Sequence, residues 1–506
     1  MKKYIFLFLT TLCLSLSAFS QTVGITDFMR LNPYSNFNNP AYFIPYKGYL
    51  SVPPMVSNIN VSVYNSGFRY DNLFKRDGDG KPVAITPNKF VNSLSKNNWL
   101  NTQLNFEVLG FGLKIDKHFF SFSYRLKIDE RFRYSRSLFS FFLQNLEKDK
   151  HGDYLYTASS PALLEISPNL NVYQEVSLGF RAQIFDRLYV GIRPKILFGI
   201  VNVQTNRFGA KVYSDPEDYT IYGNYDVHIK MASVIPFYTK ENGTITLNME
   251  ALDFSNYGTI VKNCFSQNLG FALDLGAVYR LSQKLRVSAS ITDVGFIRWK
   301  GSPLELKCAL LPDGEYSEFS GFNAEQITDF ITNGVHINLD NIFNSANNNF
   351  ELNEINSYST ALTAKIMLDG YYDLTPSNRF ILQLKSYVMG KYLVPQFTVA
   401  YNGTFFNIFD VVVSYSMLKK SFTNVGVGFG IRLGPVHLYA GTDNVFAAVN
   451  LLNTKRASAT FGLLIDFPVK NVKEPVLNSL YKNNDEVQET QEPKPKKEKK
   501  RNETSN

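Results

Sequence analysis

The chain has 506 residues, a formal net charge of +8 and an aromatic content of 15%. Its dense basic run, KPKKEKKR, lies at the C-terminal end (Lys494–Arg501), so the charge does not indicate a nucleic-acid-binding protein. Beyond the first twenty residues no stretch approaches 18 consecutive apolar residues, which excludes a conventional transmembrane helix.

The first 21 residues, MKKYIFLFLTTLCLSLSAFSQ, have the pattern of a secretory signal peptide. Lys2 and Lys3 precede an apolar run, and Ala18 and Ser20 suit cleavage before Gln21. The alternative is an uncleaved membrane anchor, but the run is shorter than the roughly 20 residues that a spanning helix needs. We therefore expect residues 1–20 to be a signal peptide and the mature chain to be exported.

Residues 21–48 are rich in Asn, Pro and Tyr and show no clean periodicity. Their length is sufficient for a plug inside a barrel, and the alternative is a loose periplasmic lead.

From residue 49 to residue 467, long stretches alternate between apolar and polar residues, which is typical of strands with two different faces. The predicted strands are about fourteen in number: 49–66, 102–115, 118–133, 169–184, 187–206, 267–281, 284–300, 357–373, 378–390, 393–404, 407–418, 422–433, 435–446 and 456–467. Many of them exceed the typical strand length of about five or six residues.

The connections between these strands alternate between long and short. The long ones include 67–101, 134–168, 207–266 and 301–356, whereas DK (116–117), SQ (282–283) and GP (434–435) are little more than turns. This alternation predicts an all-β fold: a transmembrane antiparallel β-barrel with long extracellular loops and short periplasmic turns. The expected location is the cell outer membrane, with membrane lipid as the first partner; a soluble all-β protein is the alternative.

The alternation assigns polar side chains to the inner face of the barrel. The lumen-facing candidates share predicted strands with apolar, lipid-facing neighbours and are Glu175, Arg181, Arg193, Lys195, Asp274, Arg280 and Arg286.

Prolines within predicted strands mark places where the ladder of hydrogen bonds is interrupted. Pro194, Pro395 and Pro53–Pro54 each remove a donor. Pro194 is the candidate for a kink in the wall, because the apolar register continues on both sides of it. The defect is either a bulge near the rim or a kink that opens a lateral gap.

Two cysteines remain after signal cleavage, and in an exported protein Cys264 and Cys308 could form a disulfide. Helical segments are predicted over the loop at 137–148 and at 323–334. Residues 468–506 are charged and poor in apolar residues after Tyr481, which predicts a disordered periplasmic tail; the alternative is a basic arm that touches a periplasmic partner.

No enzymatic signature is present. The sequence lacks G-x-S-x-G, H-E-x-x-H, a Walker loop and C-x-x-C, and its five histidines show no metal-ligand spacing. The DGDGK stretch (Asp77–Lys81) lacks the later Glu of a calcium loop. We therefore predict a non-enzymatic protein without cofactor or metal.

Three motifs resemble a family of Bacteroidota outer-membrane barrels of unassigned function: NPYSNFNNPAY (32–42), SITDVGFIRWKG (290–301) and GIRLGPVHLYAGTDNV (430–445). That family is similar to the fatty-acid-transporter-like barrels, including the PorV type, and to the PorP/SprF type. The resemblance implies a fourteen-stranded barrel with an N-terminal plug and brings no established activity. Its motif residues either bind a ligand or tie down the plug or a turn: Asp293, Gly295, Trp299, Asp443 and Asn444.

Two functions follow as hypotheses. The first is passage of small, hydrophobic molecules through a plugged lumen with a lateral exit. The second is a structural or adaptor role in a cell-envelope or secretion complex, with other envelope proteins as partners.

Overall fold

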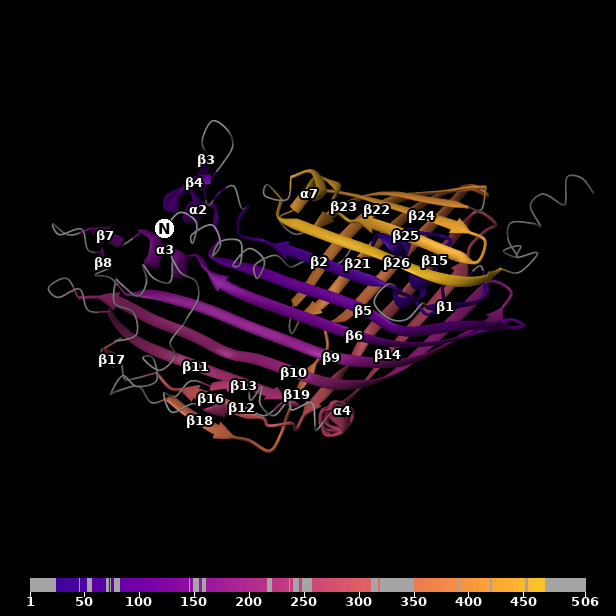
Figure 1. The fold of residues 1–506 in the computed structure, drawn as a ribbon. Helices are drawn as coiled ribbons and strands as arrows, with labels where there is room; N and C mark the ends of the chain where they lie inside the picture. Colours follow the sequence, from indigo (N-terminus) through magenta and orange to yellow (C-terminus); the bar gives the residue numbers. More distant parts are fainter. Residues whose placement is uncertain are drawn as a thin grey trace, which may run out of the picture.

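The computed structural model describes residues 24–44, 46–51, 57–69, 72, 74–76, 82–144, 146–148, 154–156, 161–215, 221–235, 237–239, 245–247, 257–310, 317–318, 350–389, 392–406, 408–418, 421–450 and 454–468. The strands of this part of the chain form a closed antiparallel β-barrel of 14 wall strands (Figure 1). The predicted fold class is confirmed. Within the same ranges, no helix has the length and apolar character needed to span a membrane.

Consecutive wall strands pair with one another, and the last closes on the first. In order they are β1 (Tyr46–Ser51) with β2 (Ile59–Asn65), β5 (Asn97–Ile115), β6 (His118–Ser135), β9 (Ala162–Phe185), β10 (Leu188–Ser214), β14 (Leu269–Arg280), β15 (Leu285–Trp299), β20 (Ala364–Thr375), β21 (Asn378–Met389), β22 (Tyr392–Phe405), β23 (Phe409–Leu418), β24 (Ser421–Leu433), β25 (Val436–Thr442) and β26 (Arg456–Pro468).

Two predicted strands are divided. The predicted strand 49–66 corresponds to β1 and β2, which together fill one position because both pair with β26 and with β5. The predicted strand 357–373 corresponds to β19 (Tyr358–Ala361) and β20, which both pair with β15. The short connections lie at one end of the barrel, here the short-turn end, and the opposite end is the long-loop end.

The polarity of the wall is inverted relative to a soluble protein. Its outward side chains are large, apolar and exposed: Leu178, Phe271, Leu382, Val413, Phe429 and Phe461. Its inward side chains are polar and buried: Glu175, Arg193, Asp274, Gln383, Thr398 and Asp410. An apolar band around a polar interior is the arrangement that a lipid environment favours, and closure leaves no unpaired strand edge in hydrocarbon.

At the long-loop end, strands extend beyond the barrel into a further sheet. β9 and β10 have 24 and 27 residues, and β10 continues its pairing onto β11 (Ile221–Ser233). β11 then pairs with β16 (Leu304–Cys308) and β17 (Ser317–Glu318), and β16 pairs with β18 (Phe350–Glu354). These strands were predicted as loop. β16, β17 and β18 have only five, two and five residues, whereas the alternation of polar and apolar residues in β11 was overlooked.

The remaining described elements are short hairpins and helices near the long loops. The hairpins are β3 (Phe74–Arg76) with β4 (Pro82–Ile85), β7 (Leu146–Lys148) with β8 (Tyr154–Tyr156), and β12 (Phe237–Thr239) with β13 (Ile245–Leu247). The helices are α2 (Pro87–Ser93), α3 (Arg136–Gln144), α4 (Tyr257–Ser266) and α7 (Val445–Val449). α3 confirms the helix predicted at 137–148 as far as Gln144, but Leu146–Lys148 form β7 instead. The predictions at 323–334 and 77–81 lie outside the described residues.

Residues 24–44, here the N-terminal segment, lie inside the barrel near the short-turn end (Figure 1). The segment contains two short 3-10 helices, η1 (Ile25–Phe28) and η2 (Pro33–Phe37). Ile25, Met29 and Tyr34 share a buried cluster with inward wall residues such as Val412 and Leu464.

Candidate functional site: the bore of the barrel

The N-terminal segment is held in the bore by side chains of the wall. Asp443 accepts a hydrogen bond from the Ile25 amide at 3.0 Å, and Asp410 accepts one from the Leu31 amide at 2.8 Å. Among the described residues, its main-chain to main-chain hydrogen bonds stay within the segment, as from Asp27 to Gly24. The segment is therefore docked on the wall without being a strand of the sheet.

Side chains of the segment reach the wall in several further places. The Tyr34 hydroxyl donates to Glu107 at 3.0 Å, the Tyr42 hydroxyl donates to Asp369 at 2.5 Å, and Arg193 donates to the Asn36 amide oxygen at 2.9 Å. These contacts come from strands all around the barrel.

Two inward glycines make room for this docking. A Cβ at Gly191 would lie 2.2 Å from the Pro40 carbonyl carbon, and one at Gly276 would lie 2.0 Å from Asn39 Oδ1. At Gly191 the nearest atoms belong to the backbone of the segment, so a larger residue there would displace it. At Gly276 they belong to the Asn39 and Pro40 side chains, so a larger residue there would first displace those side chains.

Asp27 should make the docking depend on pH. Burial raises the pKa of its carboxyl from 3.8 to about 7; Lys385 opposes this rise, while Asp443 and Asp369 add to it. Between these two values the folded protein holds a proton that the unfolded chain releases, so stability falls as pH rises toward 7 and stays low above it. We expect the wild type to be less stable at pH 8 than at pH 5.5.

Urea unfolding at the two pH values checks this expectation, with Asp27→Asn as the reference that cannot ionise. The fall in unfolding free energy should be larger for the wild type than for the variant. An equal fall in both proteins would assign the pH dependence to other groups.

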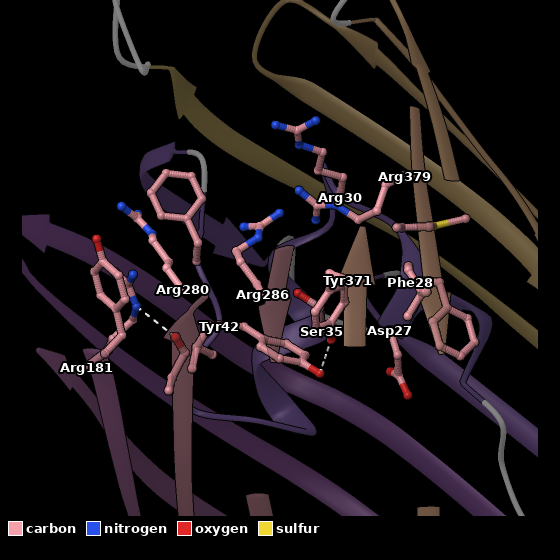
Figure 2. A pocket seen from close by; sticks show the side chains of 16 residues that line it. Asp27, Phe28, Arg30, Ser35, Tyr42, Arg181, Arg280, Arg286, Tyr371 and Arg379 are labelled. Atoms are coloured by element: carbon pink, nitrogen blue, oxygen red, sulfur yellow. Dashed lines mark hydrogen bonds between the residues drawn. The ribbon is translucent and has the colours of Figure 1, made fainter. Parts of the chain in front are cut away.

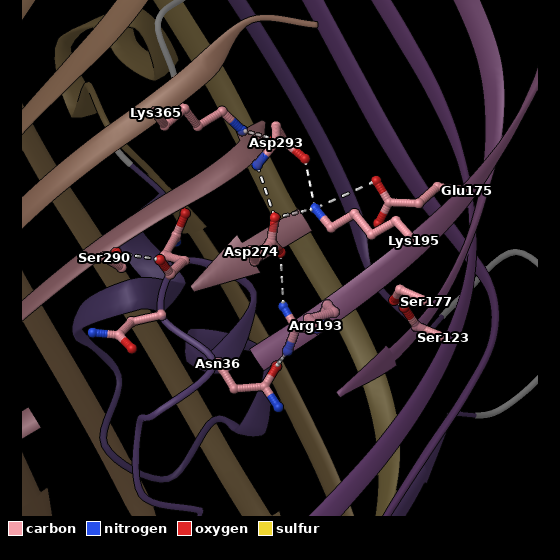
Figure 3. Close-up of polar contacts among 12 residues, drawn as sticks. Asn36, Ser123, Glu175, Ser177, Arg193, Lys195, Asp274, Ser290, Asp293 and Lys365 are labelled. Carbon is pink, nitrogen blue, oxygen red and sulfur yellow. Dashed lines mark hydrogen bonds and ion pairs between the residues drawn. The ribbon is translucent and has the colours of Figure 1, made fainter. Parts of the chain in front are cut away.

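Eight charged side chains meet further along the bore, and Figure 3 shows Glu175, Arg193, Lys195, Asp274, Asp293 and Lys365 among them. This charge cluster comprises Glu175, Asp274 and Asp293 with Arg125, Lys127, Arg193, Lys195 and Lys365.

Lys195 lies at the centre of the charge cluster. Its Nζ is 2.6 Å from Asp293 Oδ1, 2.7 Å from Asp274 Oδ1 and 3.7 Å from Glu175 Oε2. Glu175 also pairs with Arg125 and, at 2.6 Å, with Lys127. Seven of the eight side chains are more than nine-tenths buried, and Lys365 is 19% exposed. The cluster is therefore a largely desolvated ionic network in which each charge depends on its partners.

Local strand geometry turns Asp293 into the cluster. The β14–β15 register shifts between Leu273 and Leu275, so β15 carries one extra residue there. Asp293 adopts a left-handed conformation (φ 58°), and its amide donates to Asp274 Oδ1 at 2.8 Å. This is a β-bulge that re-aims a side chain. In the sequence the bulge corresponds to the TDVG part of the 290–301 motif. The alternation of apolar and polar residues did not predict a bulge there.

The wall is irregular on both sides of the bulge. β15 pairs with β20 through Leu285–Thr292 and with β19 through Phe296–Trp299, with the Gly295 carbonyl accepting from the Leu362 amide at 2.9 Å. Between β9 and β10 the pairing omits Arg193 and Pro194, without a register shift. Pro194 faces outward, and on its other side the pairing with β14 continues through Leu273.

The predicted site residues fall into three groups. Glu175, Arg193, Lys195, Asp274 and Asp293 belong to the charge cluster. Arg181, Arg280 and Arg286 instead lie at the short-turn end, around a cavity next to the N-terminal segment (Figure 2).

Three further motif residues hold parts of the chain together. Trp299 is fully buried, and its indole N–H donates to the Thr360 hydroxyl at 2.8 Å. Asp443 binds the N-terminal segment and pairs with Arg456 at 2.9 Å, while the Asn444 side chain donates to the Arg456 carbonyl.

Sequence reasoning missed three members of the cluster: Arg125, Lys127 and Lys365. A signal was available, because Arg125 and Lys127 alternate with apolar residues in a predicted strand. The alternation does not reveal, however, which strands face one another across the bore.

The suggested disulfide between Cys264 and Cys308 is not formed, because both cysteines are free. Cys264 is in α4, whose Phe265 packs against Phe198 on the outside of the wall. Cys308 is buried in the β16 sheet at the long-loop end. The two residues therefore lie in different parts of the molecule.

In the described ranges, no group of three or more His, Cys, Asp or Glu side chains could hold a metal ion. Of the five histidines, His437 is buried in the wall and His228 bonds to Glu305 at 2.8 Å. His151 and His336 lie outside the described residues.

A family model described as a family of unknown function (DUF5723) matches residues 40–443. The chain belongs to this family. The match runs from the end of the N-terminal segment to Asp443, so it includes the charge cluster and all but the last wall strand. No curated protein matches the sequence.

Solved structures with a similar fold include three outer-membrane proteins. The Pseudomonas putida toluene transporter TodX is 8% identical, with 88% of this chain and 93% of that chain covered and a TM-score of 0.36. A Pseudomonas aeruginosa FadL homologue is 10% identical, with 89% and 100% covered and a TM-score of 0.39. The Ralstonia pickettii toluene transporter TbuX is 8% identical, with 89% and 95% covered and a TM-score of 0.38. At such values the likeness carries no information on the ligand of this chain.

Proposed function

We propose that the protein is a non-enzymatic outer-membrane passage for small molecules, closed in this state by its N-terminal segment acting as a plug. The observation that carries the proposal is the way the bore is filled. The plug is docked through side chains and, in the part of the chain that the structure describes, shares no ladder with the wall. It can therefore leave while the barrel stays closed on itself.

The cargo we propose is hydrophobic and leaves through the wall. An apolar molecule moving straight along the bore would meet the charge cluster. To pass, the molecule would have to separate the buried ions from their partners, which is energetically costly. The irregular wall at Pro194 and at the Asp293 bulge lies next to the cluster, since Arg193 pairs with Asp274 across β10 and β14. A lateral opening there would lead the cargo into lipid.

The remaining assignments belong to the same proposal. Residues 1–20 are a signal peptide, 21–48 carry the plug, 49–467 form the barrel, and 468–506 are a periplasmic tail. The short-turn end then faces the periplasm. The resemblance to a Bacteroidota outer-membrane barrel family of unassigned function, itself similar to the PorV and PorP/SprF types, supports this placement.

One observation favours the second hypothesis, an adaptor in an envelope complex. The sheet formed by β10, β11, β16 and β18 extends beyond the barrel at the long-loop end and offers a surface to a partner. Purification of the native protein from membranes in mild detergent separates the two functions, because an adaptor brings a stoichiometric partner with it.

A reversible disulfide between the plug and the wall tests passage directly. It is formed by Asn39→Cys and Gly276→Cys in a background of Cys264→Ala and Cys308→Ala. The two thiols are within reach, because a Cβ built at Gly276 lies 2.9 Å from Asn39 Cγ, and the sulfur of a cysteine at position 39 would occupy the place of that Cγ. Entry of a panel of small hydrophobic and polar probes into proteoliposomes is then measured before and after reduction. We expect little entry with the disulfide formed and entry at the level of the cysteine-free background after reduction.

Asn39→Cys alone, treated in the same way, is the matched control for the reductant. Equal entry in the locked and reduced states, with the disulfide verified by mass spectrometry, would show that the plug does not gate the bore. Absence of entry for every probe even after reduction would rule out passage and leave the adaptor.

A further inference from the structure

A cavity of about 60 Å³ lies between the N-terminal segment and the inner wall at the short-turn end (Figure 2). Five arginines line it: Arg30 from the segment and Arg181, Arg280, Arg286 and Arg379 from β9, β14, β15 and β21. A water molecule needs about 10–15 Å³ of such space, so the cavity accommodates about four to six water-sized groups. That is the size of a phosphate group.

Aromatic rings and hydrogen bonds hold these guanidinium groups in place. Arg280 lies over the Tyr189 ring at 4.8 Å, and Arg181 lies over the same ring at 4.4 Å while donating to the Ala41 carbonyl at 3.0 Å. Arg30 donates to the Pro376 carbonyl. Positions fixed in this way before a ligand arrives lower the entropic cost of binding.

The charge of the site favours an anion. Arg286 and Arg379 both pair with Asp373, at 2.8 and 2.6 Å, but two arginines on one carboxylate leave net positive charge. Asp27 is the carboxylate among the lining residues, and its Oδ2 lies 3.6 Å from Lys385 Nζ. Figure 2 shows Arg30, Arg280, Arg286 and Arg379 pointing to the same side of the cavity.

We propose that this arginine-lined cavity binds a phosphate group at the short-turn end of the barrel. Guanidinium groups match phosphate oxygens in geometry and bind them through charge-assisted pairs of hydrogen bonds. The phosphate belongs either to a small soluble anion or to a lipid head group. The site joins Arg30 of the N-terminal segment to arginines of four wall strands, and it does not depend on whether the bore conducts.

Calorimetric titration of the purified full-length mature protein in detergent tests the proposal, at constant ionic strength. One titrant is inorganic phosphate and the other is a short-chain phosphatidic acid below its micellar concentration. Arg280→Gln and Arg30→Gln each remove one guanidinium from the cavity, from the wall and from the segment respectively. Arg207→Gln, on β10 at the long-loop end, is the matched control because its side chain is 65% exposed and pairs with Asp226.

We expect saturable binding with one site per chain, weakened about tenfold by Arg280→Gln and by Arg30→Gln and unchanged by Arg207→Gln. Binding of inorganic phosphate assigns the site to a soluble anion, and binding of phosphatidic acid alone assigns it to a lipid head group. Heat-modifiable gel migration establishes that each variant is folded. Absence of binding for both titrants, or equal affinity in the wild type and both folded cavity variants, would overturn the proposal.

Discussion

Leu178→Arg should destabilise the barrel in lipid by about 2–4 kcal/mol, the cost of a cationic side chain on the lipid face near the bilayer midplane. Leu178 projects outward from β9 and is 59% exposed in the absence of lipid. In the proposed membrane placement this exposed side chain contacts acyl chains, and an arginine there would lose its hydration. Urea unfolding in lipid vesicles, followed by heat-modifiable gel migration, measures the change in unfolding free energy.

The same strand supplies a matched control in Leu163, which is 50% exposed. Fifteen residues separate the two leucines, about 50 Å at the rise of an extended strand. Even with a tilt of about 45°, this exceeds the apolar band of about 25 Å, so Leu163 lies in water if Leu178 lies in lipid. Leu163→Arg should change stability by less than 1 kcal/mol. Equal effects at the two positions would refute the membrane placement of this wall.

The second large effect is expected from Asp293→Asn, which removes one anion from the charge cluster and leaves three lysines near a neutral amide. Removing one partner from a buried ionic network costs about 3–5 kcal/mol. Asparagine adopts the left-handed conformation of Asp293 as readily as aspartate does, so the bulge itself is preserved. The same unfolding assay measures the loss.

Two further variants separate charge from shape. Asp293→Asn combined with Lys365→Met removes a cation together with the anion. The free energy of unfolding of this double variant should therefore exceed the value expected from adding the two single effects by about 0.5–3 kcal/mol. Asp226→Asn, whose partner Arg207 is 65% exposed, should cost less than about 1 kcal/mol. A cost for Asp293→Asn no larger than that of Asp226→Asn would mean that the cluster is solvated.

The wall of the barrel could be read from the sequence because its signals are local. Each strand is visible as an alternation of apolar and polar residues, which an apolar outer face and a polar bore require at every position. Each short turn is visible as the break between two such alternating stretches. The inward positions of Glu175, Arg193, Lys195 and Asp274 follow from the same alternation. β11, which lies beyond the barrel, alternates in the same way, with Val227, Ile229 and Met231 between polar residues, and its signal was overlooked.

The contents of the bore were decided only by closure of the barrel. Lys127 and Asp293 are 166 residues apart in sequence and meet because their strands face one another across the bore. Asp443 reaches the Ile25 amide over 418 residues for the same reason. The arginines of the cavity come from the N-terminal segment and four separate strands, so no window of sequence contains the site. Alternation determined which side chains point inward, while strand order, the bulge at Asp293 and the fold of the N-terminal segment determined which of them meet.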